Sequence, residues 1–182
     1  MAYVPKKFHV LNVAHDLFKK YGFHSVGVDR IIADSNVAKM TFYNGFRSKN
    51  NLIFAIVERE ISDQKTSLEN ALINIEECEN IAYLKALYNW HSTFVKQKNY
   101  NGCLLNKALV ELWGNSEIIN MIEDFNSWKF ELVLSYFDKT NKSQAILFFN
   151  LLNGMLLPAN KNIIKWTDLE KIIQLNSHLI KE

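Results

Sequence analysis

The sequence predicts an all-α protein in which a small N-terminal three-helix head precedes a larger helical body. Three observations support this fold class. The 182 residues include only two prolines and six glycines, so few residues interrupt helices. Apolar residues recur at helical spacing, and no segment shows a convincing two-residue alternation. Near the N-terminus, two short helical segments are separated by only three residues.

The head is expected to contain helices at about residues 6–21, 28–34 and 38–44. Apolar side chains such as Val10 and Phe18 share one face of the first helix, and Gly22 follows it as a helix-ending glycine. Asn36 lies in the break between the second and third helices. Asparagine tolerates a left-handed backbone better than most residues, so a tight turn is expected there.

The body is expected to begin with a long helix that Ser48 caps and that extends to about residue 76. Asn115 is a candidate cap for a later helix, and Thr167 with Glu170 forms the pattern of a capping box. We therefore divide the chain into a head, residues 1–47, and a body, residues 48–182. The five further helices of the body are expected at about residues 80–98, 102–113, 116–138, 142–157 and 167–181.

The charge is distributed unevenly along the chain. Residues 1–60 contain nine lysines and arginines against five acidic residues, whereas the remaining 122 residues contain twelve against fourteen. A basic head on a slightly acidic body is typical of a module that binds a polyanion, although chance clustering would explain the charge alone equally well.

Several classes of protein are not expected. Cys78 and Cys103 form no ligand-spaced cluster, so we expect reduced thiols and a cytoplasmic location. The sequence has neither a signal peptide nor an apolar segment long enough to span a membrane. The five histidines form no i,i+4 pair, and no phosphate-binding glycine loop or nucleophile elbow is present. We therefore expect no metal, no cofactor and no enzyme.

Residues 23–52 carry the most specific pattern in the chain. Val28 and Ile31 give a short helix one apolar face, a three-residue break around Asn36 follows, and a second short helix begins with Lys39 and contains Phe42. Two short helices joined by a tight turn, the second basic, are the layout of a helix-turn-helix that binds DNA.

The segment from about residue 10 to residue 52 resembles the DNA-binding head of the tetracycline-repressor (TetR-like) family of bacterial transcription regulators. In the body, only residues 102–108 (Gly-Cys-Leu-Leu-Asn-Lys-Ala) resemble a segment of one subset of that family. The resemblance implies a dimeric, ligand-responsive DNA-binding regulator, by default a repressor released from a palindromic operator when a small molecule binds the C-terminal domain. The matching residues are Ala14, Phe18, Gly22, Gly27-Val28-Asp29, Ile31-Ile32-Ala33, Val37-Ala38-Lys39, Thr41-Phe42-Tyr43, Phe46 and Ser48-Lys49.

The resemblance also implies roles for individual residues in DNA binding. Lys39, Met40 and Asn44 are expected nearest to base edges in the major groove. Thr41, Tyr43 and Lys49 are expected to contact phosphates.

The sequence departs from the family at two positions in this head. Asn36 stands where the family usually has glycine, and Gly45 stands where it often has a histidine that reaches a phosphate. The loss of this donor predicts weaker DNA binding, or binding that depends more on the lysines.

The resemblance implies an effector pocket among the helices of the body. Bulky side chains at helical spacing are suitable walls for it, and they are equally suitable for an ordinary core. His91 is expected to be a hydrogen-bonded or exposed histidine rather than a ligand contact. The candidate pocket residues are Trp90, Phe94, Cys103, Trp113, Phe125 and Trp128.

The last two helices carry more apolar surface than a peripheral helical hairpin needs. Two copies could pair these helices in a four-helix bundle about a two-fold axis, which the resemblance favours; the alternative is that the surface is internal core. The predicted dimer interface comprises Phe149, Leu152, Leu156, Leu169, Ile172 and Ile173.

An alternative function is a helical ligand-binding or scaffolding protein whose head has lost specific DNA binding. Salt dependence separates the two classes, because neutralising several phosphates makes affinity fall steeply with salt. The partners expected for the regulator are double-stranded operator DNA, a second copy of the chain and an unidentified small-molecule effector, with no membrane.

Overall fold

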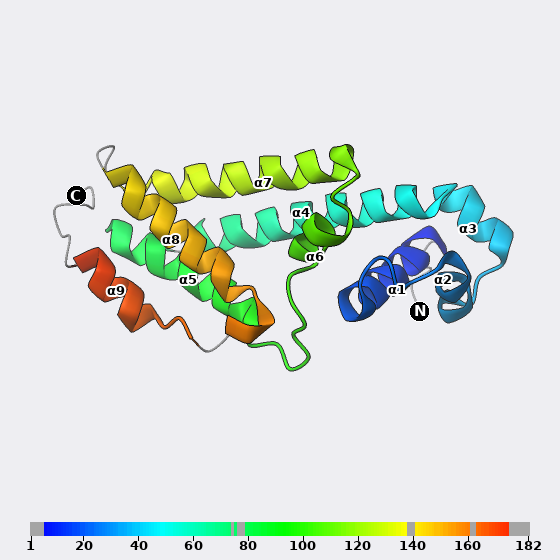
Figure 1. The fold of residues 1–182 in the computed structure, drawn as a ribbon, viewed down its shortest axis with the longest axis horizontal. Coiled ribbons are helices and arrows are strands. Elements are labelled where there is room, and N and C mark those ends of the chain that lie inside the picture. The colour runs from blue at the N-terminus through cyan, green and yellow to red at the C-terminus, as the bar shows by residue number, and fades with distance from the viewer. Residues whose placement is uncertain (1–5, 74, 76–78, 138–140, 161–162, 175–182) are drawn as a thin grey trace. The chain divides into compact units, whose positions relative to one another are not determined.

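The computed structural model describes residues 6–73, 75, 79–137, 141–160 and 163–174. In this part of the chain the regular structure is helical and no strand is present, which confirms the predicted all-α class (Figure 1). The chain divides into two compact units. The first unit contains residues 1–62 and 104–122, and the second contains residues 63–103 and 123–182.

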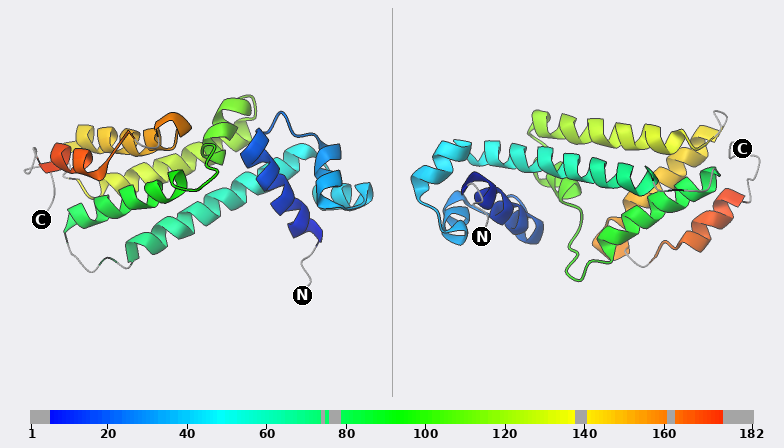
Figure 2. Two further views of the ribbon diagram at one scale, coloured as in Figure 1. Left: turned by 90° about the horizontal axis from the view of Figure 1, so that it is seen from below. Right: turned by 180° about the vertical axis from the view of Figure 1, so that it is seen from behind.

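The first unit begins with three short helices that pack on one another. Within it, α1 contacts both α2 and α3 (Figure 2). These three helices lie where the apolar spacing predicted them, within two residues at each end. The elements of the first unit are α1 (Lys6–Tyr21), α2 (Val28–Ser35), α3 (Lys39–Phe46), the first part of α4 (Lys49–Ile73), α6 (Leu104–Glu111) and the start of α7 (Ser116–Leu134).

Aromatic side chains form the centre of the first unit. Phe18 of α1 and Phe23 of the following loop are fully buried, with ring centroids 4.9 Å apart. Phe42 of α3 is also fully buried, and Leu52 and Ile56 of α4 close the core. Burying a side chain of this size contributes about 1.5–3 kcal/mol. The core therefore fixes α3 against both α1 and α4.

The second unit is a helical bundle with its own core. In this unit α5 packs against α8 (Figure 1). Its elements are the remainder of α4 and α7, α5 (Asn80–Val95), α8 (Lys142–Met155), the 3-10 helix η2 (Pro158–Asn160) and α9 (Trp166–Gln174). Its buried core residues are Leu68, Leu84, Leu87, Trp90, Val133, Phe137, Ala145, Phe148, Leu152, Met155, Leu169 and Ile173.

The compact units do not follow the boundary that we placed between residues 47 and 48. In the first unit α6 is tied to the start of the chain by two polar contacts. Lys107 donates to the carbonyl of Lys19, and the Glu111 carboxylate accepts the His24 N–H at 2.9 Å. Helix α6 therefore belongs structurally with the head. The division into a DNA-binding part and an effector-binding part stays a prediction about function.

Two of the predicted helix caps are present. The Ser48 hydroxyl accepts the Asn51 N–H at 3.1 Å, and the Asn115 side chain accepts the Ile118 N–H at 3.3 Å. Each satisfies a donor that the first turn of a helix leaves free.

The predicted capping box at Thr167 is wrong. Helix α9 begins one residue earlier, at Trp166, and the N–H groups of Asp168 and Leu169 donate to the carbonyl of Lys165. Thr167 therefore lies inside the first turn. The predicted helix limits at residues 76, 138 and 181, and Cys78, lie outside the described residues. None of the helices in the described part of the chain is both long enough and apolar enough to cross a bilayer.

The backbone after α1 predicts a strong effect for Gly22→Ala. Gly22 has a φ of +82°, and a Cβ placed there would lie 2.5 Å from Oε1 of Glu111. A non-glycine residue in this region is strained, so we expect the free energy of unfolding to fall by about 1–3 kcal/mol.

Gly114→Ala is the matched control, because a Cβ at Gly114 meets no atom within 4 Å and the residue has no positive φ. Urea unfolding of both variants measures the difference. Equal midpoints for the two would contradict the proposed strain.

Candidate nucleic-acid interface

The turn between α2 and α3 is closed by Asn36. Its φ of 49° and ψ of 44° confirm the predicted left-handed backbone. Its N–H donates to the Ala33 carbonyl at 3.1 Å, and the Val37 N–H donates to the Ile32 carbonyl at 3.4 Å. Carbonyls at the end of α2 thereby gain partners, as in other helices that end on a left-handed residue. The angle between the two helices is set by this closure.

Helix α3 turns its aromatic side towards the core of the first unit. Phe42 and Phe46 are four residues apart, and both are buried, with exposed fractions of 0% and 4%. The Tyr43 ring lies edge-on to Phe42, with ring centroids 5.3 Å apart, while 38% of Tyr43 remains exposed. Phe42 and Phe46 therefore belong to the core and are not available to contact bases.

The opposite side of α3 is free. Lys39 and Tyr43 are one helical turn apart, as are Met40 and Asn44, and all four are exposed, Met40 to 68%. Thr41 is half-buried beside them. Five of the six predicted DNA contacts therefore lie on one eight-residue helix, and four of them form a single exposed face.

Lys49, the sixth predicted contact, lies differently. Its Nζ donates to the carbonyl of Phe23 at 2.7 Å and lies 6.0 Å from the centroid of the Phe18 ring. Burial lowers the pKa of the Lys49 ammonium, and the Glu111 carboxylate opposes the shift. In this conformation the charge of Lys49 is used to hold the loop after α1.

Arg47 is an exposed cation that the sequence pattern did not select. It follows α3 directly, and its N–H donates to the Tyr43 carbonyl at 2.9 Å. Its φ of 62° is in a region that non-glycine residues rarely occupy. Backbone strain of this kind concentrates at functional sites. The only signal in the sequence is a basic residue next to the Ser48 cap.

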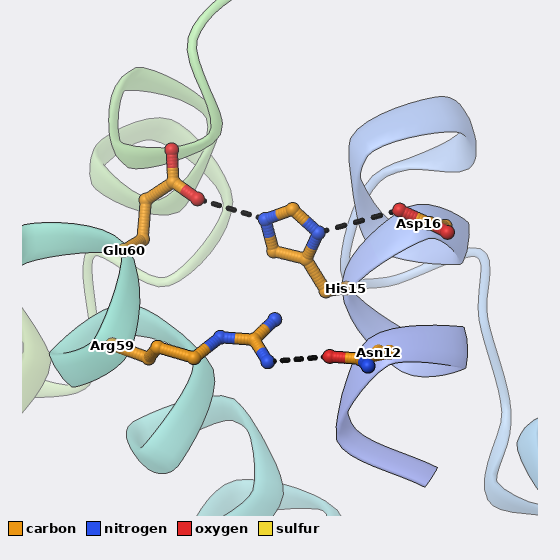
Figure 3. Close-up of polar contacts among 5 residues, drawn as sticks. All are labelled: Asn12, His15, Asp16, Arg59 and Glu60. Carbon is orange, nitrogen blue, oxygen red and sulfur yellow. Dashed lines mark hydrogen bonds and ion pairs between the residues drawn. The ribbon is translucent and has the colours of Figure 1, made fainter. Parts of the chain in front are cut away.

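Polar side chains join α1 to α4 within the first unit (Figure 3). The His15 Nε2–H donates to the Glu60 carboxylate at 2.7 Å, and Arg59 donates to the Asn12 side chain at 2.6 Å. Nδ1 of His15 also lies 3.4 Å from the Asp16 carboxylate. Because α4 begins at the end of α3, these contacts fix the frame in which α3 is presented.

The predicted pocket residues divide between the two units. Trp113 lies in the first unit and is 81% exposed, so we leave it out of the candidate pocket. The other five lie in the second unit. There, Trp90 and Phe94 pack edge to face with ring centroids 4.7 Å apart, and Phe125 stacks on Trp128 at 5.7 Å. Cys103 is half-buried and forms no disulfide.

His91 fulfils only half of its expected role as a satisfied histidine, because one ring nitrogen is hydrogen-bonded and the other is not. It is 3% exposed, and although Nδ1 bonds to the Leu87 carbonyl, the buried Nε2 has no partner. Lys129, which sequence reasoning passed over, is buried in the same unit. Groups of three or more potential metal ligands are absent from the described residues.

The predicted dimer residues lie mostly inside the second unit. Leu152, Leu156, Leu169 and Ile173 are at most 5% exposed in the single chain, which is the alternative that the sequence left open for this surface. Phe149 is half-buried, and the side chain of Ile172 lies outside the described part of the structure. The exposed apolar residues described in this region are Ile146, Leu147, Leu157 and Ile163, with exposed fractions of 43%, 46%, 50% and 66%.

Comparisons with known proteins agree with this geometry. Residues 10–56 match the sequence pattern of the bacterial regulatory proteins of the tetR family. The chain is 25% identical over 130 residues to the HTH-type transcriptional repressor DhaR of Mycobacterium sp. (strain GP1), a match that covers 70% of this chain and 64% of that repressor. The chain thus spans just under two thirds of the length of this curated relative.

Solved structures share the fold over nearly the whole chain. SCO4454, a TetR-family transcriptional regulator from Streptomyces coelicolor, superimposes with a TM-score of 0.78 at 19% identity and covers 93% of this chain and 91% of its own. The reduced form of NemR from E. coli gives a TM-score of 0.75 at 21% identity, covering 97% of both chains. Residues 10–56 thus carry the sequence pattern of the tetR family of bacterial regulatory proteins, and the chain as a whole shares the fold of solved TetR-family regulators.

Proposed function

We propose that this protein is a dimeric, ligand-responsive transcription regulator that binds operator DNA through α3. The observation that carries the proposal is the exposed face of α3, which holds Lys39, Met40 and Asn44 opposite the buried pair Phe42 and Phe46. A two-turn helix with one side anchored in a core and the other free is what entry into the major groove requires.

The exposed side chains suit direct readout of bases. Lys39 can donate to O6 and N7 of guanine, and Asn44 can pair with N6 and N7 of adenine. Met40 can make only apolar contact, for which the thymine methyl group is the natural partner. Each well-formed bidentate contact discriminates against the wrong base by about 1–3 kcal/mol.

Phosphate contacts would fix the position of α3 in the groove. Thr41 and Tyr43 keep this role, because Tyr43 lies on the exposed face and Thr41 lies half-buried beside it. We add Arg47, whose exposed guanidinium lies at the junction of α3 and α4, and the free N–H groups at the start of α4. A phosphate contact by Lys49 would require its ammonium to leave the Phe23 carbonyl, so we assign Lys49 first to holding the head together.

Dimerisation would place two such heads on a pseudo-palindromic site. The two recognition helices would then be about 34–36 Å apart on one face of the DNA. Among the exposed apolar residues of the second unit, Ile146, Leu147 and Leu157 lie on or next to α8 and are the surface that we propose for a partner. The alternation of buried and exposed positions along α8 supports one face for the core and another for a second copy.

Repression relieved by a ligand is the mode of regulation that we favour. The name of the Mycobacterium relative, a transcriptional repressor, supports repression over activation. A coupling of about 1–3 kcal/mol between effector and operator would change DNA affinity about 5–150-fold. The route that we propose is α4, a single helix whose first part belongs to the first unit and whose remainder belongs to the second.

A mobility-shift assay tests the proposal. The probes are the DNA upstream of the protein's own gene and a pool of random sequences, at moderate salt. A discrete complex with either probe supports a DNA-binding regulator. Absence of a complex with both would instead favour a ligand-binding or scaffolding protein whose head has lost specific DNA binding.

Arg47→Gly should make the protein more stable and yet weaken DNA binding. Glycine removes the strain at a φ of 62°, so the free energy of unfolding should rise by about 0.5–1 kcal/mol. Loss of the guanidinium should weaken operator binding about tenfold. Urea unfolding and fluorescence anisotropy measure the two quantities separately.

Lys39→Ala is the control for this pair of effects, because Lys39 is exposed and has no positive φ. It should weaken operator binding and leave the unfolding midpoint unchanged. If Arg47→Gly binds DNA as well as the wild type, Arg47 contacts no phosphate and that part of the proposal fails.

Gly45→His should tighten DNA binding by supplying the donor that the family often has at this position. The position has room for the side chain, because a Cβ on Gly45 meets only Cγ of Lys7, at an ordinary 3.7 Å. One added phosphate contact predicts a gain of about fivefold in affinity. Anisotropy titrations of the two proteins give the ratio, and Gly45→Leu controls for side-chain bulk. No gain with histidine would contradict the predicted role.

A further inference from the structure

A lysine is buried among aromatic side chains in the second unit. Lys129 of α7 is only 6% exposed. Its Nζ lies 4.9 Å from the Phe125 ring and 5.9 Å from the Phe149 ring, and 3.5 Å from Oδ1 of Asn153, which is the long limit of a hydrogen bond. No carboxylate among the described residues forms an ion pair with it.

The surroundings of Lys129 oppose its charge. Burial lowers the pKa of the ammonium, and only the Cys103 side chain acts in the opposite direction. Aromatic faces stabilise a cation far less than a carboxylate does in a place from which water is excluded. A buried lysine without a counter-charge therefore weakens the fold unless something else binds it.

A second buried group without a full set of partners lies close enough to Lys129 for the lysine charge to affect its pKa. His91 of α5 is 3% exposed, and its Nδ1–H donates to the Leu87 carbonyl at 2.8 Å. Burial lowers the pKa of His91 to about 3, the bond to Leu87 opposes this shift, and the charge of Lys129 adds to it. The ring is therefore neutral, and Nε2 carries a buried lone pair with no donor.

The two groups need complementary partners. The Lys129 ammonium lacks a negatively charged acceptor, and Nε2 of His91 lacks a donor. Aromatic rings surround both: Phe125 and Phe149 lie beside Lys129, and Trp90 is edge-on to His91 at 4.8 Å between ring centroids. One ligand that combines a carboxylate, a hydroxyl and an aromatic ring would satisfy all three features.

We propose that Lys129 and His91 form the recognition site for a small aromatic hydroxy acid, with Lys129 binding the carboxylate and Nε2 of His91 accepting the hydroxyl proton in a hydrogen bond. The ring of Phe149 lies 5.9 Å from the ammonium and is half-buried, so we expect the ligand to enter beside it. The role of the acid as the effector rests on the proposed function. Binding of the acid itself can be measured without DNA.

Calorimetric titration and thermal unfolding of the full-length protein test the site. The probes are 2-, 3- and 4-hydroxybenzoate, with the corresponding hydroxybenzamides as neutral controls. At least one acid should bind and raise Tm by a few degrees, whereas its amide should not, because only the acid supplies the charge that Lys129 lacks.

Lys129→Met removes the charge and keeps the length of the side chain. It should weaken binding of the acid about tenfold or more. Without ligand its Tm should be no lower than that of the wild type, because a buried unpaired charge is removed. Lys65→Met is the matched control: Lys65 also lies over a ring, 4.8 Å from that of Trp128, but it is exposed. It should bind the acid as the wild type does.

His91→Phe separates the two halves of the site. It should weaken binding of the hydroxybenzoate and leave binding of benzoate, which has no hydroxyl group, unchanged. A purely structural histidine would affect both equally.

The proposal is overturned if none of the three acids binds the wild type, or if Lys129→Met binds them as tightly. A mobility-shift assay with the same proteins keeps the two hypotheses apart. Binding of the acid without binding of DNA would leave this site standing and refute the proposed regulator. If the protein binds DNA but none of the acids, the proposed regulator stands and this site is refuted.

Discussion

Burial of Phe42 and Phe46 fixes the rotation of α3 about its own axis. This rotation decides which side chains of α3 are exposed to a partner. The helix has only eight residues, too few to be stable in isolation, so its position is determined by packing. With both phenylalanines in the core, Lys39, Met40 and Asn44 have no alternative to the outer face. The same aromatic core that stabilises the head thus determines which side chains of α3 are exposed.

The two units use charge in opposite ways. In the first unit, polar contacts such as His15 with Glu60 and Lys49 with the Phe23 carbonyl are satisfied and hold helices in place. In the second unit, Lys129 and Nε2 of His91 are buried without suitable partners. A satisfied network rigidifies a fold, whereas an unsatisfied one weakens it unless a ligand completes it. On this contrast we propose that the first unit presents α3 and that the second recognises a small molecule.

Local patterns in the sequence predicted the helices and the orientation of α3. The pair Phe42 and Phe46 at i,i+4, and an asparagine between two short helices, both carry their physical reason within a few residues. Features that depend on tertiary packing were not predictable. Nothing near Lys49 in sequence indicates that its ammonium meets the Phe23 carbonyl, and an arginine gives no sign of a positive φ at position 47. Lysine is normally exposed, so the sequence did not predict the burial of Lys129 either.

The salt dependence of DNA affinity tests the central claim most directly, using a duplex selected by the protein from a random pool. If each head of a dimer places Arg47 on a phosphate, about two phosphates are neutralised, and the logarithm of the association constant should fall against that of salt concentration with a slope of about −2 or steeper. A slope near zero, or failure to select any duplex, would show that the exposed face of α3 does not bind DNA.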